Sequence, residues 1–233
     1  MKLAIMQPYF LPYIGYWQLM NAVDEFIVYD DIQYVKEGWV NRNRILVNGG
    51  DDFITIPLKR DSAALDICDR YLAESWTAER FTLFNRISAA YRKAPCFGAV
   101  LPLVREILHY DEDNLFEFLL HSLYVVKNYL EINTPFVISS MVGVGHWLKS
   151  KNKVLAICKA RGAAAYYNPI GGVNLYDKME FQAAGVDLHF LRARNFHYKQ
   201  FDNAFVPSLS ILDVMMFNPA ERVREYLEYY ELE

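Results

Sequence analysis

Residues 5–16 read Ile-Met-Gln-Pro-Tyr-Phe-Leu-Pro-Tyr-Ile-Gly-Tyr, and this stretch decides the fold that we expect. An apolar run breaks at Gln7, crosses the rigid Pro12 and resumes as a helical pattern from Gly15. That order predicts a buried strand, a loop and the start of a helix. In α/β sheets, the loop after the first strand is where backbone N–H groups and a helix N-terminus meet a ligand. We therefore expect this loop to form the floor of the active site.

The neighbouring segments extend this unit in both directions. Residues 2–6 form a short apolar run suited to a buried parallel strand, and residues 15–23 carry apolar side chains at helical spacing. Residues 25–29, Glu-Phe-Ile-Val-Tyr, predict a second strand that ends in Asp30 and Asp31. We expect the crossover between them to be right-handed and the two strands to be parallel.

The rest of the chain alternates short strands with helical patterns. The turn Asn48-Gly49-Gly50 predicts a hairpin, because Asn-Gly accepts the positive φ of a tight turn; its strands are expected at 44–47 and 53–57. Helices are expected at 77–93, 97–109, 114–130 (with Asp113 as N-cap), 148–161, 178–184 and on both sides of Asn218-Pro219. Further strands are expected at 65–68, 136–138, 163–167 and 187–191.

These elements predict a single α/β domain over residues 1–233. We expect a Rossmann-like, three-layer core with a mostly parallel sheet, a β-hairpin and a helical insertion at about residues 77–131. A chain of 233 residues is long enough to bury most of its apolar surface without disulfides.

Composition limits the classes of protein that fit this sequence. The formal net charge of −4 provides no overall basic field for nucleic acid or anionic lipid. No window of about 18 uncharged apolar residues predicts a transmembrane helix, and the chain does not open with a signal-peptide pattern. We expect a cytoplasmic protein without a nucleic-acid partner or an integral membrane segment, and a homodimer is left open.

Cysteine and histidine spacing predicts no metal site. Cys68, Cys96 and Cys158 lie far apart and read as buried thiols, and the five histidines show no close ligand spacing. His146, which follows two glycines, is the only histidine in a flexible, site-like setting. Gly-x-Ser-x-Gly, dinucleotide-binding and Walker motifs are absent, which disfavours an α/β-hydrolase, a classical dehydrogenase and a P-loop NTPase.

Aromatic residues are the compositional outlier, at 15% with 17 tyrosines. Tyrosine packs its ring and still offers a hydroxyl, so the tyrosines suit either an aromatic core and surface or a carbohydrate or nucleotide pocket.

Polar loops follow five expected strands and should meet at one edge of a parallel sheet. They are residues 7–16, residues 30–42, Ser139-Ser140, residues 168–172 and the region after Leu191. Residues that are distant in sequence would then share one pocket.

The first of these loops holds Tyr13-Ile14-Gly15-Tyr16, which is similar to the His-Ile-Gly-His signature of nucleotidylyltransferases. In those enzymes the glycine admits the nucleotide and the imidazoles stabilise phosphate charge. Tyrosines donate hydrogen bonds but bring no positive charge, so the motif fits phosphate chemistry poorly, and a simple tight turn is the alternative.

Asp30 and Asp31 offer carboxylates that orient an amine, bind a sugar hydroxyl or hold Mg²⁺. Adjacent residues in extended structure point oppositely, so we expect one of the two to face the pocket. A strand-end turn with a cap is the alternative. Arg42, next to Asn41, provides a fork for phosphate or carboxylate, or a surface ion pair.

Gly171-Gly172 permits close backbone approach to a ligand and offers N–H groups to an anion. Tyr176 and Asp177 follow, and an ordinary turn with Asp177 as a helix N-cap is the alternative. Lys151 and Lys153 fit a phosphate site or, more simply, solvated charges.

The assembled motifs resemble the WbqC-like family of bacterial proteins along the whole chain. The residues that carry the resemblance are Gln7-Pro8-Tyr9, Pro12, Gly15, Tyr16, Asp30, Asp31, Gln33, Asn41-Arg42, Gly171-Gly172, Leu175-Tyr176, Leu209-Ser210-Ile211 and Asp213. The family occurs with surface-polysaccharide (O-antigen) genes. The resemblance implies modification of a nucleotide-linked amino sugar, with aminoacyl (glycyl) transfer as the suggested activity.

We therefore favour a transferase that moves an acyl or aminoacyl group to the amine of a nucleotide-activated sugar. The catalytic candidates are Asp30, Asp31, Gln7 and Tyr16. The substrate-binding candidates are Tyr9, Gly15, Gln33, Trp39, Asn41, Arg42, Gly171, Gly172, Tyr176, Asp177, Ser210 and Asp213. The cofactor is open between an activated acyl donor and ATP with Mg²⁺. A non-catalytic binding or scaffold protein and an adenylate-forming enzyme are the alternatives.

Overall fold

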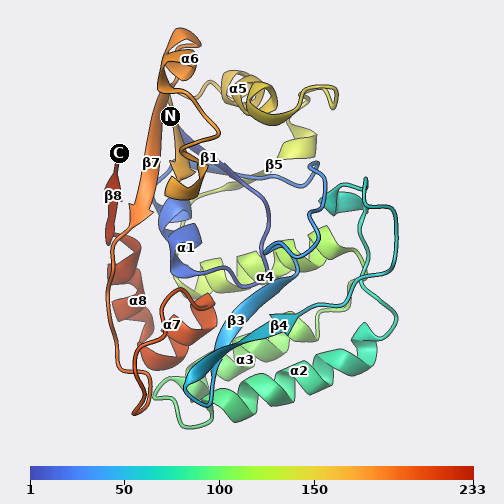
Figure 1. Ribbon diagram of the computed structural model, residues 1–233, viewed down its shortest axis with the longest axis vertical. Helices are drawn as coiled ribbons and strands as arrows, with labels where there is room; N and C mark the ends of the chain where they lie inside the picture. The colour runs from blue at the N-terminus through green and yellow to red at the C-terminus, as the bar shows by residue number, and fades with distance from the viewer.

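A six-stranded sheet occupies the upper half of the molecule, as drawn in Figure 1, in a computed structural model that describes residues 1–233. β1 (Lys2–Met6) lies between β2 (Glu25–Val28) and β6 (Ala165–Pro169), and both pair with it in parallel. β5 (Phe136–Ile138) extends the sheet beyond β2, and β7 (Asp187–Ala193) extends it beyond β6, also in parallel. The last strand, β8 (Tyr230–Leu232), is antiparallel to β7, which gives the order β5-β2-β1-β6-β7-β8.

Helices cover both faces of this sheet, because its buried strands alternate their side chains between two cores. α1 (Ile14–Asn21) and α4 (Leu115–Tyr129) pack on one face, and α5 (Ser150–Ala160) and α6 (Lys178–Ala183) on the other (Figure 1). Ala4 belongs to the first core, whereas its neighbours in β1 belong to the second. Because α1, which leads from β1 to β2, and α5, which leads from β5 to β6, lie on opposite faces, the switch point where doubly wound sheets bind ligands lies between β1 and β6.

A separate hairpin and two helices are inserted between β2 and α4. β3 (Arg42–Val47) and β4 (Gly50–Thr55) are antiparallel, and Asn48 and Gly49 adopt φ of 52° and 82° in the turn between them, as the sequence predicts. α2 (Trp76–Tyr91) and α3 (Phe97–Leu108) follow. The remaining elements are the 3₁₀ turns η1 (Ile67–Asp69), η2 (Ser139–Met141) and η3 (Ile170–Gly172), and the C-terminal helices α7 (Ile211–Phe217) and α8 (Ala220–Leu227).

The α/β fold class and the mostly parallel sheet are confirmed, but two local predictions are wrong and one strand was missed. The strand expected at 65–68 is a single bridge between Gln33 and Asp66 followed by η1, because the chain turns after one paired residue. The N-cap of α4 is Asn114, whose side chain accepts from the Glu117 N–H, and not Asp113. β8 was not anticipated. None of the helices is both long and apolar enough to cross a membrane.

Candidate active site

Hydrogen bonds fix the loop after β1 from several sides. The Trp17 indole donates to Pro12 O at 3.1 Å, and the Asn43 amide donates to Phe10 O and Leu11 O at 3.0 and 2.8 Å. The Tyr16 hydroxyl donates to Gln7 O at 3.1 Å. Because these partners come from α1 and β3, the loop is a rigid surface and not a mobile flap.

Two cavities lie against this loop and share Tyr13 and Ser208 as walls. The smaller, of about 330 Å³, is lined by aromatic and polar groups and is called the aromatic cavity: Tyr9, Tyr13, Trp39, Asn43, Arg44 and Ser208. The larger, of about 500 Å³, opens beyond the carboxyl end of β7 and is called the β7 cavity. Cavities of this size hold metabolite-sized ligands.

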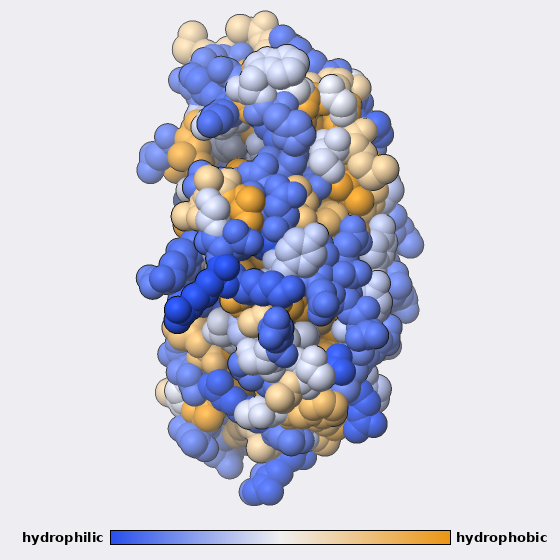
Figure 2. Space-filling view, turned by 90° about the vertical axis from the view of Figure 1, so that its right-hand side faces the viewer, coloured by the Kyte–Doolittle hydropathy of each residue, from blue (hydrophilic) through white to orange (hydrophobic).

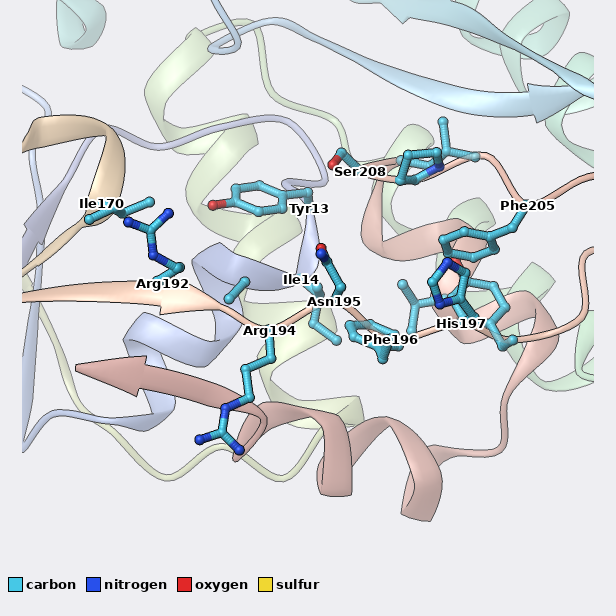
Figure 3. A pocket seen from close by; sticks show the side chains of 15 residues that line it. Tyr13, Ile14, Ile170, Arg192, Arg194, Asn195, Phe196, His197, Phe205 and Ser208 are labelled. Carbon is cyan, nitrogen blue, oxygen red and sulfur yellow. The ribbon is translucent and has the colours of Figure 1, made fainter. Parts of the chain in front are cut away.

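Apolar and polar side chains together line the β7 cavity. Tyr13 and Ser208 lie on one side of it and Asn195 and Phe196 on the other, with Arg192 beside Ile170 at the end (Figure 3). Arg192 also pairs with Glu233 at 2.6 Å, and both side chains are about half exposed. Burial raises the pKa of Tyr13, so its hydroxyl remains a neutral hydrogen-bond donor at physiological pH.

The carboxylate of Asp30 is occupied by the turn that follows β5. It accepts from the Ser139 hydroxyl at 2.8 Å, from the Ser140 N–H at 2.9 Å and from the Ser140 hydroxyl at 2.7 Å. Asp30 is only 2% exposed. This geometry matches the alternative of a strand-end cap, since Asp30 holds η2 against the end of β2.

Asp31 forms a buried ion pair that the sequence did not reveal. Its Oδ2 lies 2.7 Å from Lys153 Nζ, and the two side chains are 1% and 4% exposed. Lys153 also donates to Asp31 O, and the Ser139 hydroxyl contacts the other carboxylate oxygen. His146 Nδ1 lies 3.7 Å from Asp31 Oδ2, and its ring is 70% exposed. One carboxylate therefore connects a buried ammonium to an exposed imidazole.

This arrangement does not fit Mg²⁺. Hard cations need several open oxygen ligands, whereas the Asp30 oxygens accept hydrogen bonds and an ammonium stands beside Asp31. The negative charges of Asp30 and Asp31 are already stabilised by the hydrogen bonds from Ser139 and Ser140 and by the Lys153 ammonium. Asp66 is close enough to Asp31 and Lys153 to feel their charges. Burial raises the pKa of the Asp66 carboxyl, and the Lys153 ammonium acts in the opposite direction.

Only part of the predicted substrate-binding set lies on cavities. Tyr9 and Trp39 line the aromatic cavity, where Trp39 stacks on Phe53 at 6.2 Å. Asn41 lines a third cavity, and Arg42 donates to Gly38 O at 3.1 Å and lies over the Phe53 ring. Gln33, which is exposed, donates to Ala63 O at 2.8 Å. Tyr16 is 1% exposed and belongs to the core beneath the loop.

The loop after β6 is largely occupied by internal contacts. Gly171 is exposed, whereas Gly172 is buried and leaves room for the Asn168 side chain. Tyr176 packs edge-on against Phe181, and Asp177 accepts from the Glu180 N–H at 3.0 Å as the N-cap of α6. The cap is the simpler alternative considered for this aspartate.

Ser210 and Asp213 are buried in the core at the start of α7. The Ser210 hydroxyl donates to Leu11 O at 2.8 Å and so joins α7 to the loop. Asp213 is fully buried and accepts from three donors: Tyr91 at 2.9 Å, Tyr198 at 2.6 Å and Gln200 at 2.6 Å. Tyr198, one of the donors to Asp213, lines the β7 cavity, so Asp213 acts on that cavity through its partner.

Gly15 sets the position of the Tyr13 ring. A Cβ at Gly15 would lie 2.5 Å from atoms of that ring. We expect Gly15→Ala to push the ring out of the shared wall and to change the free energy of unfolding by no more than about 1 kcal/mol, because alanine favours the helix. A crystal structure of the variant and a urea titration check both effects. An unmoved ring, or a large loss of stability, would contradict this account.

The fold and these cavities define an α/β protein of Rossmann-like topology with ligand-sized cavities at the carboxyl edge of its sheet. The chain belongs to the WbqC-like protein family, whose model matches residues 7–225. It is 30% identical over 238 residues to "uncharacterized protein Rv1507c" of Mycobacterium tuberculosis, with 98% of each chain covered. No solved structure matches the sequence.

Proposed function

We propose that this protein transfers an acyl or aminoacyl group to the amine of a nucleotide-linked amino sugar. The observation that carries the proposal is the pair of cavities that meet at Tyr13 beside the switch point of the sheet. Trp39 and Tyr9 offer ring faces to a base or sugar. Arg44 and Arg192, which pair with the exposed carboxylates of Asp51 and Glu233, offer their remaining N–H groups to a diphosphate.

Acyl transfer to an amine needs a base, and we assign that role to His146 with Asp31, which line neither Tyr13 cavity but follow β5 and β2 at the same carboxyl edge of the sheet. The amine nitrogen forms a bond to the acyl carbon, the bond from that carbon to the donor's leaving group breaks, and the ammonium proton passes to the base. Asp31 would orient the exposed imidazole, as carboxylates do in histidine dyads. The 3.7 Å separation is longer than a hydrogen bond, and such contacts commonly tighten when substrate binds.

A binding protein without catalytic activity is the second candidate. It is favoured by the burial of Asp30 and Asp31 and by the internal partners of both carboxylates. An adenylate-forming enzyme has less support, because Tyr16 is buried and the Tyr13 ring covers Gly15.

Titration with nucleotide-linked amino sugars, followed by incubation with activated acyl donors and mass spectrometry, tests the proposal. We expect binding that Trp39→Ala weakens by about tenfold, because a stacking partner is lost. We expect amide formation that His146→Ala abolishes while binding is retained. The matched control for Trp39→Ala is Val35→Ala, which changes an exposed residue of the same loop, residues 30–42, and should leave binding unchanged. Binding without product favours the second candidate, and no binding by any nucleotide sugar rejects both.

A further inference from the structure

The third cavity, of about 470 Å³, shares no lining residue with the aromatic cavity. Arg44 of β3 lines the aromatic cavity, whereas Thr55 at the end of β4 lines the third one. Arg42 pairs with Thr55 in the ladder and lies over the Phe53 ring, which stacks on Trp39 of the aromatic cavity.

Four cations line this third cavity, which we call the basic cavity: Lys36, Lys59, Arg60 and Arg70. Asp61 is the one carboxylate in the lining, so four positive charges and one negative charge leave an excess of three. None of the four cations lies within 4.0 Å of a carboxylate oxygen. The whole chain carries −4, so this local excess is a property of the site and not of the composition.

Arg70 is the fixed part of the basic cavity. It is 8% exposed, and its guanidinium donates to Ser62 O at 3.1 Å and to Lys59 O at 3.4 Å. Its Nε has no hydrogen-bond partner. The two carbonyls orient the guanidinium but do not neutralise it, and a buried charge without a counterion is costly. An anionic ligand would supply the missing charge.

Tyr34 and Asn41 form a rigid wall beside Arg70. The guanidinium lies over the Tyr34 ring at 4.8 Å, and the Tyr34 hydroxyl donates to Asn41 Oδ1 at 2.8 Å. Asn41 in turn donates to Ile56 O at 2.7 Å. Burial raises the pKa of Tyr34, and Arg70 and Arg42 act in the opposite direction. Tyr34 therefore stays neutral and adds no negative charge.

The surroundings of the basic cavity are open to solvent and polar. Lys36, Lys59 and Arg60 are exposed. The face of the molecule that carries the segment between β4 and α2, on the right of Figure 1, is predominantly hydrophilic with scattered apolar residues (Figure 2). A small charged ligand can approach from this side.

We propose that the basic cavity binds a phosphate chain, a diphosphate or triphosphate. The excess of three positive charges matches such a chain, and the cavity is larger than a single phosphate requires. A planar guanidinium held at the base, with flexible lysines and an arginine at the rim, suits oxygen atoms spread over several phosphates. This proposal does not rest on the transferase function, because it uses none of the residues that line the Tyr13 cavities.

Calorimetric titration with inorganic triphosphate, pyrophosphate and phosphate at low ionic strength tests the site. We expect affinity to rise with chain length and to fall as salt is added, because charge is screened. Lys36→Ala with Arg60→Ala should weaken triphosphate binding by about tenfold, since two contacts to the anion are lost. Arg92→Ala with Lys93→Ala, which removes the same charges from an exposed turn, should leave binding unchanged.

Arg70→Lys distinguishes the fixed guanidinium from simple charge, because it keeps the cation and removes the fork. We expect Arg70→Lys to weaken triphosphate binding. If Arg70→Lys does not fold, the variant Lys36→Ala with Arg60→Ala, which changes exposed residues only, still tests the site. Titration with ADP and ATP shows whether the ligand is a nucleotide or a phosphate chain alone. If ADP and ATP bind more tightly than pyrophosphate and triphosphate, the site recognises a nucleotide; if they bind equally, it recognises only the phosphate chain.

Two results would overturn the proposal. One is the same loss of triphosphate affinity in the control pair as in Lys36→Ala with Arg60→Ala. The other is the absence of triphosphate binding to the unmodified protein. Trp39→Ala should leave triphosphate binding intact, so failure of the transferase proposal and failure of this one give different results.

Discussion

Asp213→Ala should lower the free energy of unfolding by roughly 3–5 kcal/mol, because it removes the acceptor of several buried donors at once. Tyr91, Tyr198 and Gln200 all donate to this carboxylate inside the core. Each would be left without that partner, and the Tyr91 hydroxyl also accepts from the Leu46 N–H. Urea denaturation followed by circular dichroism gives the measurement.

Two milder variants calibrate this prediction. Tyr91→Phe removes one donor, and Asp213→Asn retains one acceptor oxygen, so each should cost clearly less than the alanine variant. If Asp213→Ala costs no more than Tyr91→Phe, the carboxylate does not hold the network together, and a ligand-binding role for Asp213 becomes more attractive.

The pH dependence of Asp213 follows from its burial. Burial raises the pKa of its carboxyl above the ordinary value of 3.8, against hydrogen bonds that lower it. The folded chain therefore binds this proton more tightly than the unfolded chain does. The associated stability is fully present below the ordinary pKa and is lost as pH rises through the raised folded pKa. The stability difference between the parent and Asp213→Ala should thus be larger at about pH 4 than at neutral pH.

The strands, helices and hairpin are predictable from the sequence because their signals are local. The apolar run of β1, the Asn48-Gly49 turn and the helical spacing of α2 to α4 each lie within one segment. The sequence also indicates the first loop as a ligand surface, since strand, proline and helix start follow one another. β8 escapes prediction because Tyr-Glu-Leu continues the mixed acidic and aromatic sequence that follows α8, whereas β5, which is equally short, is an uninterrupted apolar run.

The charge partners of the site are not predictable in this way. Lys153 lies in the first turn of a polar helix and reads as solvated, yet it pairs with a residue from the loop after β2. Asp213 reads as an acid near a helix start, yet its donors come from α2 and from the segment before α7. Lys36 and Arg70 reach the same cavity only through the fold of the loops around the hairpin. Burial and pairing of this kind depend on tertiary contacts that no local spacing encodes.

Lys153→Met should destabilise the protein by about 3–5 kcal/mol, because it leaves the Asp31 carboxylate buried without its cation. Asp31→Asn with Lys153→Met should recover most of that loss, since the double variant has no buried charge to compensate. Lys151→Met is the matched control: it lies on the same helix turn but pairs with Glu180 at the surface, and should cost about 0–1 kcal/mol. Equal costs for the two lysine variants would contradict the buried pair.

The same double variant separates the structural role of Asp31 from its proposed catalytic role. If the pair serves only the fold, a stable Asp31→Asn with Lys153→Met protein should form the amide product at the parent rate. If Asp31 orients His146, stability returns but product formation does not, because an amide cannot stabilise the imidazolium as a carboxylate does. Measuring both quantities on one protein therefore shows whether the carboxylate at the end of β2 is retained for folding alone.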